Sequence, residues 1–297
     1  MTLSCLVISD FHLDPDEATV SIDNVSVPEG IDFVISAGDL INDPNPSDIE
    51  YGREFLKRLT ADETPILCIP GNHDHLEYTT AMVDGIDYAR CLHRETITID
   101  EVCPGSGVDD TLIVGWGCEQ FHQDPGIDFE RFPSLLDRIE GALDPSQTRE
   151  PIWSSEIETL GAYCWGEIGP EELTERLNVD GAVLATALQS VQSDARELAE
   201  LLVRSSSPPI LVTHVPPFGS TLDQHHSDAV GRFVGSMAFR IALSRVHTGL
   251  LISGHTHVAD STYDSVAKHV IGPGKRREVR IDFEADGLSY SWLHREE

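Results

Sequence analysis

The chain has 297 residues, of which 40% are hydrophobic, and it carries a formal net charge of -31. This length and hydrophobic content are typical of a globular protein with a substantial core, and they exclude an intrinsically disordered chain. The negative charge disfavours nonspecific binding to nucleic acid, which requires a basic surface.

The acidic residues are spread along the chain, and only three of the 20 basic residues are lysines, at positions 57, 268 and 275. An acidic surface that is poor in lysine is expected of a protein that stays hydrated in concentrated salt. The composition resembles that of halophilic proteins; the alternative is an acidic protein from a low-salt environment. Stability measured against salt concentration separates the two.

Targeting signals and cysteine motifs give a consistent picture of the compartment. No apolar run is long enough for a membrane-spanning helix, and the apolar start has no basic residues before it, as a secretory signal would. The six cysteines form no C-x-x-C pair, which disfavours a zinc-thiolate site. We therefore predict a cytoplasmic protein with reduced thiols and no membrane association.

Short apolar runs rich in Val, Ile and Leu recur along the chain and predict strands that are buried on both faces. They are residues 3–9, 33–37, 65–70, 111–115, 209–213 and 249–253. Strands of this kind belong to an α/β sheet covered by helices, and ligands bind beyond the carboxyl ends of such strands. Five of the six runs are followed by Asp, Asn or His, so polar side chains are expected to gather at one edge of the sheet.

Helices are predicted between these strands. A capping-box pattern at Ser47 to Glu50 predicts a helix that runs to about Leu59, and residues 76–82 predict a shorter one. Residues 236–247 form another, with Ser236 as its N-cap. Residues 13–30 favour an extended stretch over a helix. Residues 278–283 and 288–292 alternate around Asp286-Gly287 and predict a terminal hairpin.

The whole chain, residues 1–297, is predicted to be a single domain with a largely helical insertion at about residues 119–207. One helical face in this segment carries six apolar residues: Leu184, Leu188, Val191, Ala195, Leu198 and Leu202. Residues 129–143 predict a second helix. These helices either cover the sheet or form a partial cap over the substrate; cover is favoured for the long helix, and the loop 120–132 is the preferred pocket wall.

The polar residues at the strand ends suit a metal site. They are Asp10, His12, Asp39, Asn72, His214, His255 and His257. Two ions that lie about 3.5–4 Å apart need one ligand that touches both, and a carboxylate can do so. Carboxylates and imidazoles without thiolates favour Mn, Fe, Zn or Ni over Mg or Ca, with Mn the first choice. Each residue alone is a weak signal, but the ordered set is hard to explain by chance.

The motifs Asp10-Phe11-His12, Gly38-Asp39, Gly71-Asn72-His73-Asp74, His214 and Gly254-His255-Thr256-His257 resemble the signature of calcineurin-like metallophosphoesterases. The resemblance implies a four-layer α/β/β/α sandwich of two mixed sheets. It implies that Asp10, His12 and His257 hold one metal, that Asn72, His214 and His255 hold the other, and that Asp39 bridges them. It also implies catalytic roles for two residues: His73 would contact the scissile phosphate or its leaving group, and Asp74 would orient His73.

A closer likeness covers residues 214–223 and Val234-Gly235-Ser236, which are similar to an archaeal branch of phosphoesterases often labelled Icc-like. Gly272-Pro273-Gly274 resembles the family's final Asn-Pro-Gly turn, with Gly in place of Asn.

Several residues are candidates for contact with the substrate. Asn72, His73, His75 and Phe218 form the candidate substrate-binding set. Trp116 and Phe218 could line a pocket for an apolar leaving group, although ordinary packing is slightly preferred for both. His225 and His226 are expected to be exposed, although one of them could line the pocket. Asn42 and Asp43, just past Asp39, could contact a group that supports the ligands.

The leading hypothesis is metal-dependent hydrolysis of a phosphomonoester or phosphodiester on a small molecule, with a metal-bound hydroxide as the nucleophile. A non-catalytic interaction protein on the same fold is one alternative, but the complete ligand set disfavours it. A nuclease of the same superfamily is another, disfavoured by the lack of a basic groove. Protein phosphatase activity has no separate support, and the oligomeric state is left open.

Overall fold

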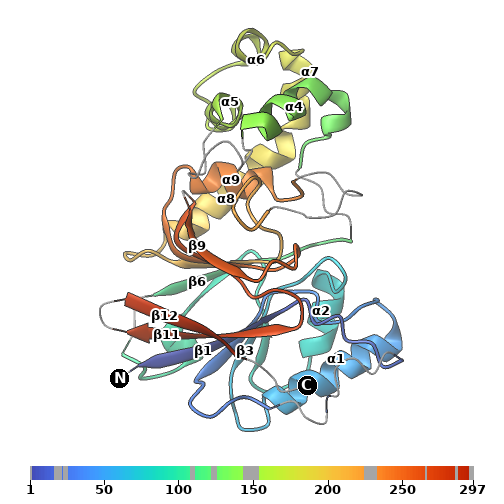
Figure 1. Cartoon of the computed structure of the whole chain (residues 1–297), viewed down its shortest axis with the longest axis vertical. Helices are drawn as coiled ribbons and strands as arrows, with labels where there is room; N and C mark the ends of the chain where they lie inside the picture. Colours follow the sequence, from blue (N-terminus) through green and yellow to red (C-terminus); the bar gives the residue numbers. More distant parts are fainter. Residues whose placement is uncertain are drawn as a thin grey trace.

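Two six-stranded mixed sheets pack face to face and carry helices on their outer faces, which is the expected four-layer α/β/β/α arrangement (Figure 1). The structure is a computed structural model. It describes residues 2–16, 22, 26–107, 111–121, 126–142, 154–223, 233–264, 266–284 and 287–293.

The first sheet has the order β12-β11-β1-β2-β3-β4. Its parallel strands are β1 (Leu3–Ser9), β2 (Phe33–Ser36), β3 (Ile66–Cys68) and β4 (Ala89–Cys91). The strands β11 (Arg277–Glu284) and β12 (Gly287–Leu293) pair with each other antiparallel, and β11 also pairs antiparallel with β1. The predicted terminal hairpin is therefore confirmed as a strand pair; Asp286 lies outside the described residues.

The second sheet has the order β5-β6-β7-β8-β10-β9. Its parallel strands are β6 (Leu112–Trp116), β7 (Ile210–Thr213), β8 (Thr248–Ser253) and β10 (Ala267–Gly272). The antiparallel edges are β5 (Glu95–Thr98) and β9 (Asp260–Asp264). All six predicted strands are thus present.

The core explains why the strands are apolar throughout. Val7 and Ile35 face the second sheet, where they pack in one cluster with Val212. The alternate residue Leu6 faces outwards and packs against Phe55. Each central strand therefore buries both faces, which removes the alternation seen in half-exposed strands.

The first sheet is covered by α1 (Pro46–Leu59) and α2 (Leu76–Val83). The predicted capping box at Ser47 is wrong, because α1 begins earlier: the Asn45 side chain accepts hydrogen bonds from the amides of Ser47 and Asp48. Pro46 favours this start, since its fixed φ suits the first helical position and it has no amide that needs a partner. In the 13–30 link, Leu13 forms an isolated parallel bridge with Ile41.

The second sheet is covered by α8 (Gln189–Leu202) and α9 (Met237–Leu243). Ser236 is the N-cap of α9, as predicted, but the helix ends at Leu243 rather than His247. The long helical pattern is divided at Leu188 into α7 (Gly181–Ala187) and α8. All six of its apolar residues are buried nonetheless.

The remaining helices of the 119–207 segment stand together above α8 and α9, away from the sheets (Figure 1). They are α4 (Pro133–Ala142), α5 (Ser155–Cys164), α6 (Pro170–Leu177) and α7. The helix predicted over 129–143 is split into a 3₁₀ turn at Phe129–Arg131 and α4, because Pro133 opens a new helix. The short α3 (Ile99–Val102), capped by Thr98 and Glu101, was not predicted, nor were α5 and α6.

Within the described ranges, no helix combines the length and the apolar character needed to cross a bilayer. The cytoplasmic location stays a prediction. All six cysteine thiols are free in the structure.

The revised start of α1 can be tested by substitution. Replacing Asn45 with Ala should lower the free energy of unfolding by about 1 kcal/mol, because two amides of the first turn lose their acceptor. Replacing Ser47 with Ala should have a clearly smaller effect. Denaturant melts at constant salt would measure both, and a larger loss for Ser47→Ala would contradict this cap.

Candidate metal centre

The candidate ligands meet where five parallel strands end, three in the first sheet and two in the second. Asp10 and His12 follow β1, Asp39 follows β2, and Asn72 follows β3. From the second sheet, His214 follows β7, and His255 and His257 follow β8. The predicted edge is therefore built from both sheets, whose strand ends lie close together.

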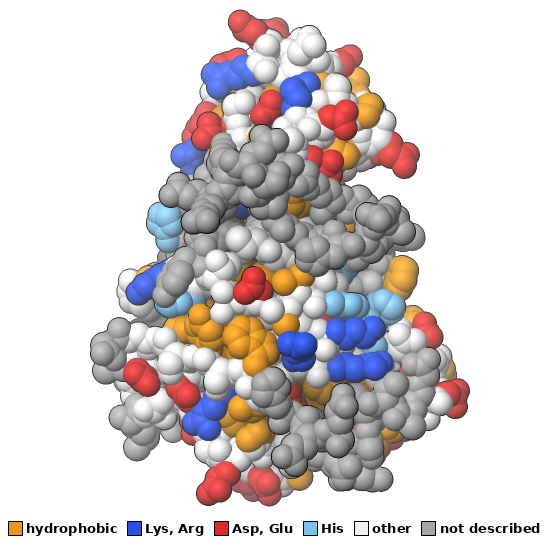
Figure 2. Space-filling view, in the orientation of Figure 1, with side chains coloured by type: hydrophobic (Ala, Val, Ile, Leu, Met, Phe, Trp, Pro, Cys, Tyr) orange, Lys and Arg blue, Asp and Glu red, His pale blue; other side chains and the backbone are white. Residues whose placement is uncertain are grey.

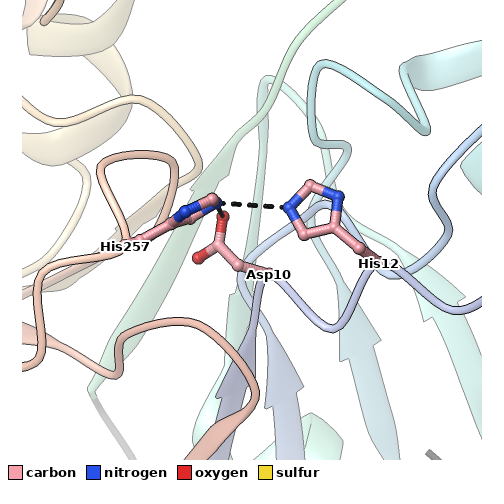
Figure 3. Close-up of side chains that lie close together, drawn as sticks. All are labelled: Asp10, His12 and His257. Carbon is pink, nitrogen blue, oxygen red and sulfur yellow. Dashed lines mark hydrogen bonds and ion pairs between the residues drawn. The ribbon is translucent and has the colours of Figure 1, made fainter. Parts of the chain in front are cut away.

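One group of side chains gathers around His257 (Figure 3). Its Nε2 atom lies 3.2 Å from Nε2 of His12 and 3.6 Å from Oδ1 of Asp10. The three side chains come from two loops and point toward one another. Their ligand atoms lie close enough together for a single ion.

A second group gathers around Asn72. Its Oδ1 atom lies 3.0 Å from Nε2 of His214 and 3.1 Å from Nδ1 of His255. Nε2 of His214 is also 3.3 Å from Oδ2 of Asp39. Amide oxygen, imidazole and carboxylate again form a donor set for a divalent ion.

Asp39 lies between the two groups. Its Oδ2 atom is 3.3 Å from His214 and 3.8 Å from Nε2 of His12, and so faces one histidine of each group. Its other oxygen, Oδ1, accepts a hydrogen bond of 2.8 Å from the backbone amide of His73. The carboxylate is thus held by one oxygen while the other is directed at both groups.

The electrostatics of the buried centre suit cations. Asp10 and Asp39 are 0% and 2% exposed, so two carboxylates are removed from water close together. Burial, together with the charge of Asp39, raises the pKa of Asp10 to about 6 against the opposing effect of His214. Burial lowers the pKa of His12 to about 3, which leaves its ring neutral and able to offer a lone pair. The residues therefore fit bound divalent metals.

His214 holds a proton that a metal would replace. Its Nδ1 lies 2.9 Å from the carbonyl oxygen of Ala37, which can only accept, so this nitrogen carries a hydrogen. Its Nε2 faces the oxygens of Asn72 and Asp39. Burial, the largest single effect, lowers the pKa of His214, but the charge and hydrogen bond of Asp39, together with Asp10 and the Ala37 carbonyl, outweigh it and raise the pKa to about 9.

The backbone around the centre is strained. Ten described residues other than Gly have positive φ, and five of them are candidate ligands: Asp10, His12, Asp39, His255 and His257. Positive φ is unfavourable for residues with a Cβ atom and is found mostly where function demands it. Gly71 permits the tight packing of these loops, since a Cβ there would lie 2.1 Å from the amide nitrogen of Asp39.

His73 and Asp74 are arranged differently from the expectation. The two Asp74 oxygens accept hydrogen bonds from the backbone amides of Gly71, Asp39 and Leu40, at 2.7, 3.0 and 2.6 Å. Nδ1 of His73 instead lies 2.5 Å from the carbonyl oxygen of Asn42. Asp74 therefore fastens the β2 and β3 loops together, and Asn42 rather than Asp74 orients the His73 ring.

Among the substrate candidates, Asn72 and His73 lie in the centre. His75 begins α2 and packs against Tyr78, with ring centroids 4.5 Å apart. Phe218 is 0% exposed and packs between Phe129 and Phe233, so it offers no surface to a ligand in this structure. Phe218 thus packs in the core, whereas ordinary packing at the rim of the pocket was the interpretation slightly preferred.

The loop after β6 reaches the centre through a residue that the sequence did not single out. Phe121 is 52% exposed, and its ring lies 5.3 Å from that of His73. It belongs to the 120–132 loop that was the preferred pocket wall. Trp116 is buried against Phe239, and His225 and His226 lie outside the described residues.

Comparison with known proteins gives a family match. A family model described as calcineurin-like phosphoesterase matches residues 3–259. No curated protein matches the sequence.

Three solved structures resemble the chain. The phosphopantetheinyl hydrolase PptH from Mycobacterium tuberculosis is 15% identical, with a TM-score of 0.47 over 92% of this chain and 89% of that one. A dimetal phosphatase from Danio rerio is 11% identical, with a TM-score of 0.49 over 98% and 95%. The sulfate thiohydrolase SoxB from Thermus thermophilus is 11% identical, with a TM-score of 0.44 over 98% of this chain and 56% of that one.

Metal binding should release a proton from His214. The ring is protonated below pH 9 in the metal-free protein, and a ligand nitrogen must be deprotonated. Apparent affinity for Mn²⁺ should therefore rise between about pH 7 and 9, by up to about tenfold per pH unit. Competition with a chelating dye would measure it. An affinity that is constant across this interval would contradict the proton assignment.

Proposed function

The chain belongs to the calcineurin-like phosphoesterase family, and from this premise we propose that it hydrolyses a phosphoester bond of a small molecule at a centre of two divalent metal ions. The observation that carries the proposal is the position of the Asp39 carboxylate, whose Oδ2 atom faces His12 in one ligand group and His214 in the other. A single shared carboxylate is what two adjacent ions require.

In this proposal, each group holds one ion. Asp10, His12 and His257 would hold the first ion. Asn72, His214 and His255 would hold the second, and Asp39 would touch both. When bound, the ions supply positive charge to the phosphate oxygens and acidify water.

His73 would act on the substrate rather than on the metals. The Asn42 carbonyl accepts the Nδ1 proton of its ring, so Nε2 is left to face the substrate. Its ring also lies edge-on to that of His12, with centroids 4.8 Å apart, which puts it beside the first ion. A protonated ring at this point would steady the phosphate and deliver a proton to the leaving group. Asp74 would contribute indirectly, by holding the loop that carries His73.

Finer assignments are also proposals. We propose Mn²⁺ as the first metal to supply, since carboxylates and imidazoles without thiolates suit it. Aryl phosphate monoesters and bis-aryl diesters are the two substrate types to compare.

The full ligand set supports an enzyme over an interaction protein, and the net charge of -31 disfavours a nuclease. Residues 1–297 are proposed as one domain, with the 119–207 helices as an insertion.

Substitutions at Asp39 and His73 should separate metal binding from chemistry. Asp39→Ala should lose bound metal and all measurable turnover of an aryl phosphate ester. His73→Asn should retain metal but lower kcat by roughly 10²–10⁴, the range for a lost proton donor. Metal content by mass spectrometry and initial rates would be measured on the same samples.

The matched control is His247→Asn. His247 is exposed and lies before β8, at the opposite end of that strand from His255. It should keep both metal and activity. Turnover retained by Asp39→Ala, or none by the unaltered protein with any metal and either ester type, would refute the proposal.

We also propose that the fold depends on concentrated salt, in keeping with the likeness of residues 214–223 to an archaeal branch. A net charge of -31 destabilises the compact state by self-repulsion, and about 1 M salt shortens the screening distance to roughly 3 Å. The melting temperature should therefore rise steeply between about 0.1 and 2 M KCl. An unchanged melting temperature over this interval would contradict the proposal.

A further inference from the structure

Three consecutive basic residues lie beside the metal centre, at the end of the connection from β10 to β11 and the start of β11. They are Lys275, Arg276 and Arg277, and Figure 2 shows Lys and Arg side chains gathered next to His side chains on this face. The whole chain has only 20 Lys and Arg residues against 51 Asp and Glu. A basic run at this point stands out against a strongly acidic surface.

Arg276 is fastened to the metal-binding loop. Its Nε donates a hydrogen bond of 2.9 Å to the carbonyl oxygen of Phe11, the residue between Asp10 and His12. Arg276 also has a φ of 55°, in the left-handed region that residues with a Cβ atom avoid. A long cationic side chain held in this way beside two candidate ligands indicates a functional position.

The residues around Lys275 are placed beside the loops of the centre. A Cβ atom at Gly274 would lie 2.6 Å from that of Ala259, two residues after His257, and Arg277 pairs with Ser9, the residue before Asp10. Lys275 and Arg277 are exposed, and Arg276 is half-buried. The basic run therefore lies next to the loops that carry the candidate ligands.

No acidic partner neutralises this basic run in the part of the chain that the structure describes. Other arginines do pair there: Arg94, for example, contacts Glu119, Asp194 and Glu197. Lys275, Arg276 and Arg277 form no such ion pair with a described residue. They are thus available to an anionic ligand.

We propose that Lys275, Arg276 and Arg277 bind a second anionic group of the substrate, while the phosphoester itself sits at the metals. The substrate class is then a phosphoester that carries a further phosphate or carboxylate. Arginine suits this task because its planar guanidinium can form paired hydrogen bonds with an oxyanion, and lysine adds a point charge. The proposal rests on the proposed function in placing the first phosphate at the metals.

Binding of two phosphonates tests this role without any turnover, since their carbon–phosphorus bonds are not esters. Butylphosphonate carries one anionic group, and butane-1,4-bisphosphonate carries two. Their dissociation constants would be measured by calorimetry on Mn²⁺-supplemented protein at fixed ionic strength. The unaltered protein should bind the bisphosphonate about tenfold more tightly, which corresponds to about 1.4 kcal/mol.

The double variant Lys275→Gln/Arg277→Gln should reduce this ratio to near one, while Lys268→Gln, an exposed lysine on β10, should keep it. Arg276→Gln should also reduce the ratio. A ratio unchanged by the double variant, or reduced equally by Lys268→Gln, would overturn the inference.

Binding and turnover together separate this inference from the proposed function. If both phosphonates bind and the ratio responds, but no phosphoester is turned over, the basic run binds anions and the proposed function fails. If esters are hydrolysed but the ratio does not respond, only the second-anion site fails. If neither phosphonate binds in the presence of metal and no phosphoester is turned over, both are overturned.

Discussion

The candidate metal centre depends on two buried carboxylates, those of Asp39 and Asp74, which accept hydrogen bonds from backbone amides. Asp74 accepts hydrogen bonds from three amides in the loops after β2 and β3, and Asp39 accepts one from His73. Each loop therefore holds the other. Because the fixed oxygen of Asp39 leaves its second oxygen aimed at His12 and His214, the geometry of the ligand groups follows from this mutual bonding.

This arrangement costs stability locally. Five candidate ligands have positive φ, and the carboxylates of Asp10 and Asp39 are both buried. Both features are unfavourable and persist only when the surrounding structure over-determines them. The strands that precede the loops supply that support, since β1, β2, β7 and β8 are fully or almost fully buried and pack in one core between the sheets. The buried strands of the two sheets thus stabilise the strained loops at their ends.

The sequence predicted those structural features that have a clear pattern of residue types. Strands buried on both faces appear as uniformly apolar runs, so all six were found, together with the candidate ligands at their ends. Helix boundaries were predicted less well, because capping depends on single side chains. Helix α1 is capped by Asn45 and not by Ser47, and the helical pattern of residues 184–202 is interrupted at Leu188. The Asn42 carbonyl that orients His73 could not be predicted, because every residue has a carbonyl. The contact between Phe121 and His73 could not be predicted either, because it depends on the path of the loop after β6.

The strongly acidic composition does not conflict with an anionic substrate. At low ionic strength a net charge of -31 would repel an approaching phosphoester over tens of ångströms, but salt confines this repulsion to a few ångströms. Direct contacts at hydrogen-bond distance are screened much less. An acidic protein in salt can therefore bind an anion if cations lie at the point of contact, and the proposed metal ions and the adjacent residues 275–277 would meet that condition. The position of the few basic residues then matters more for recognition than the total charge.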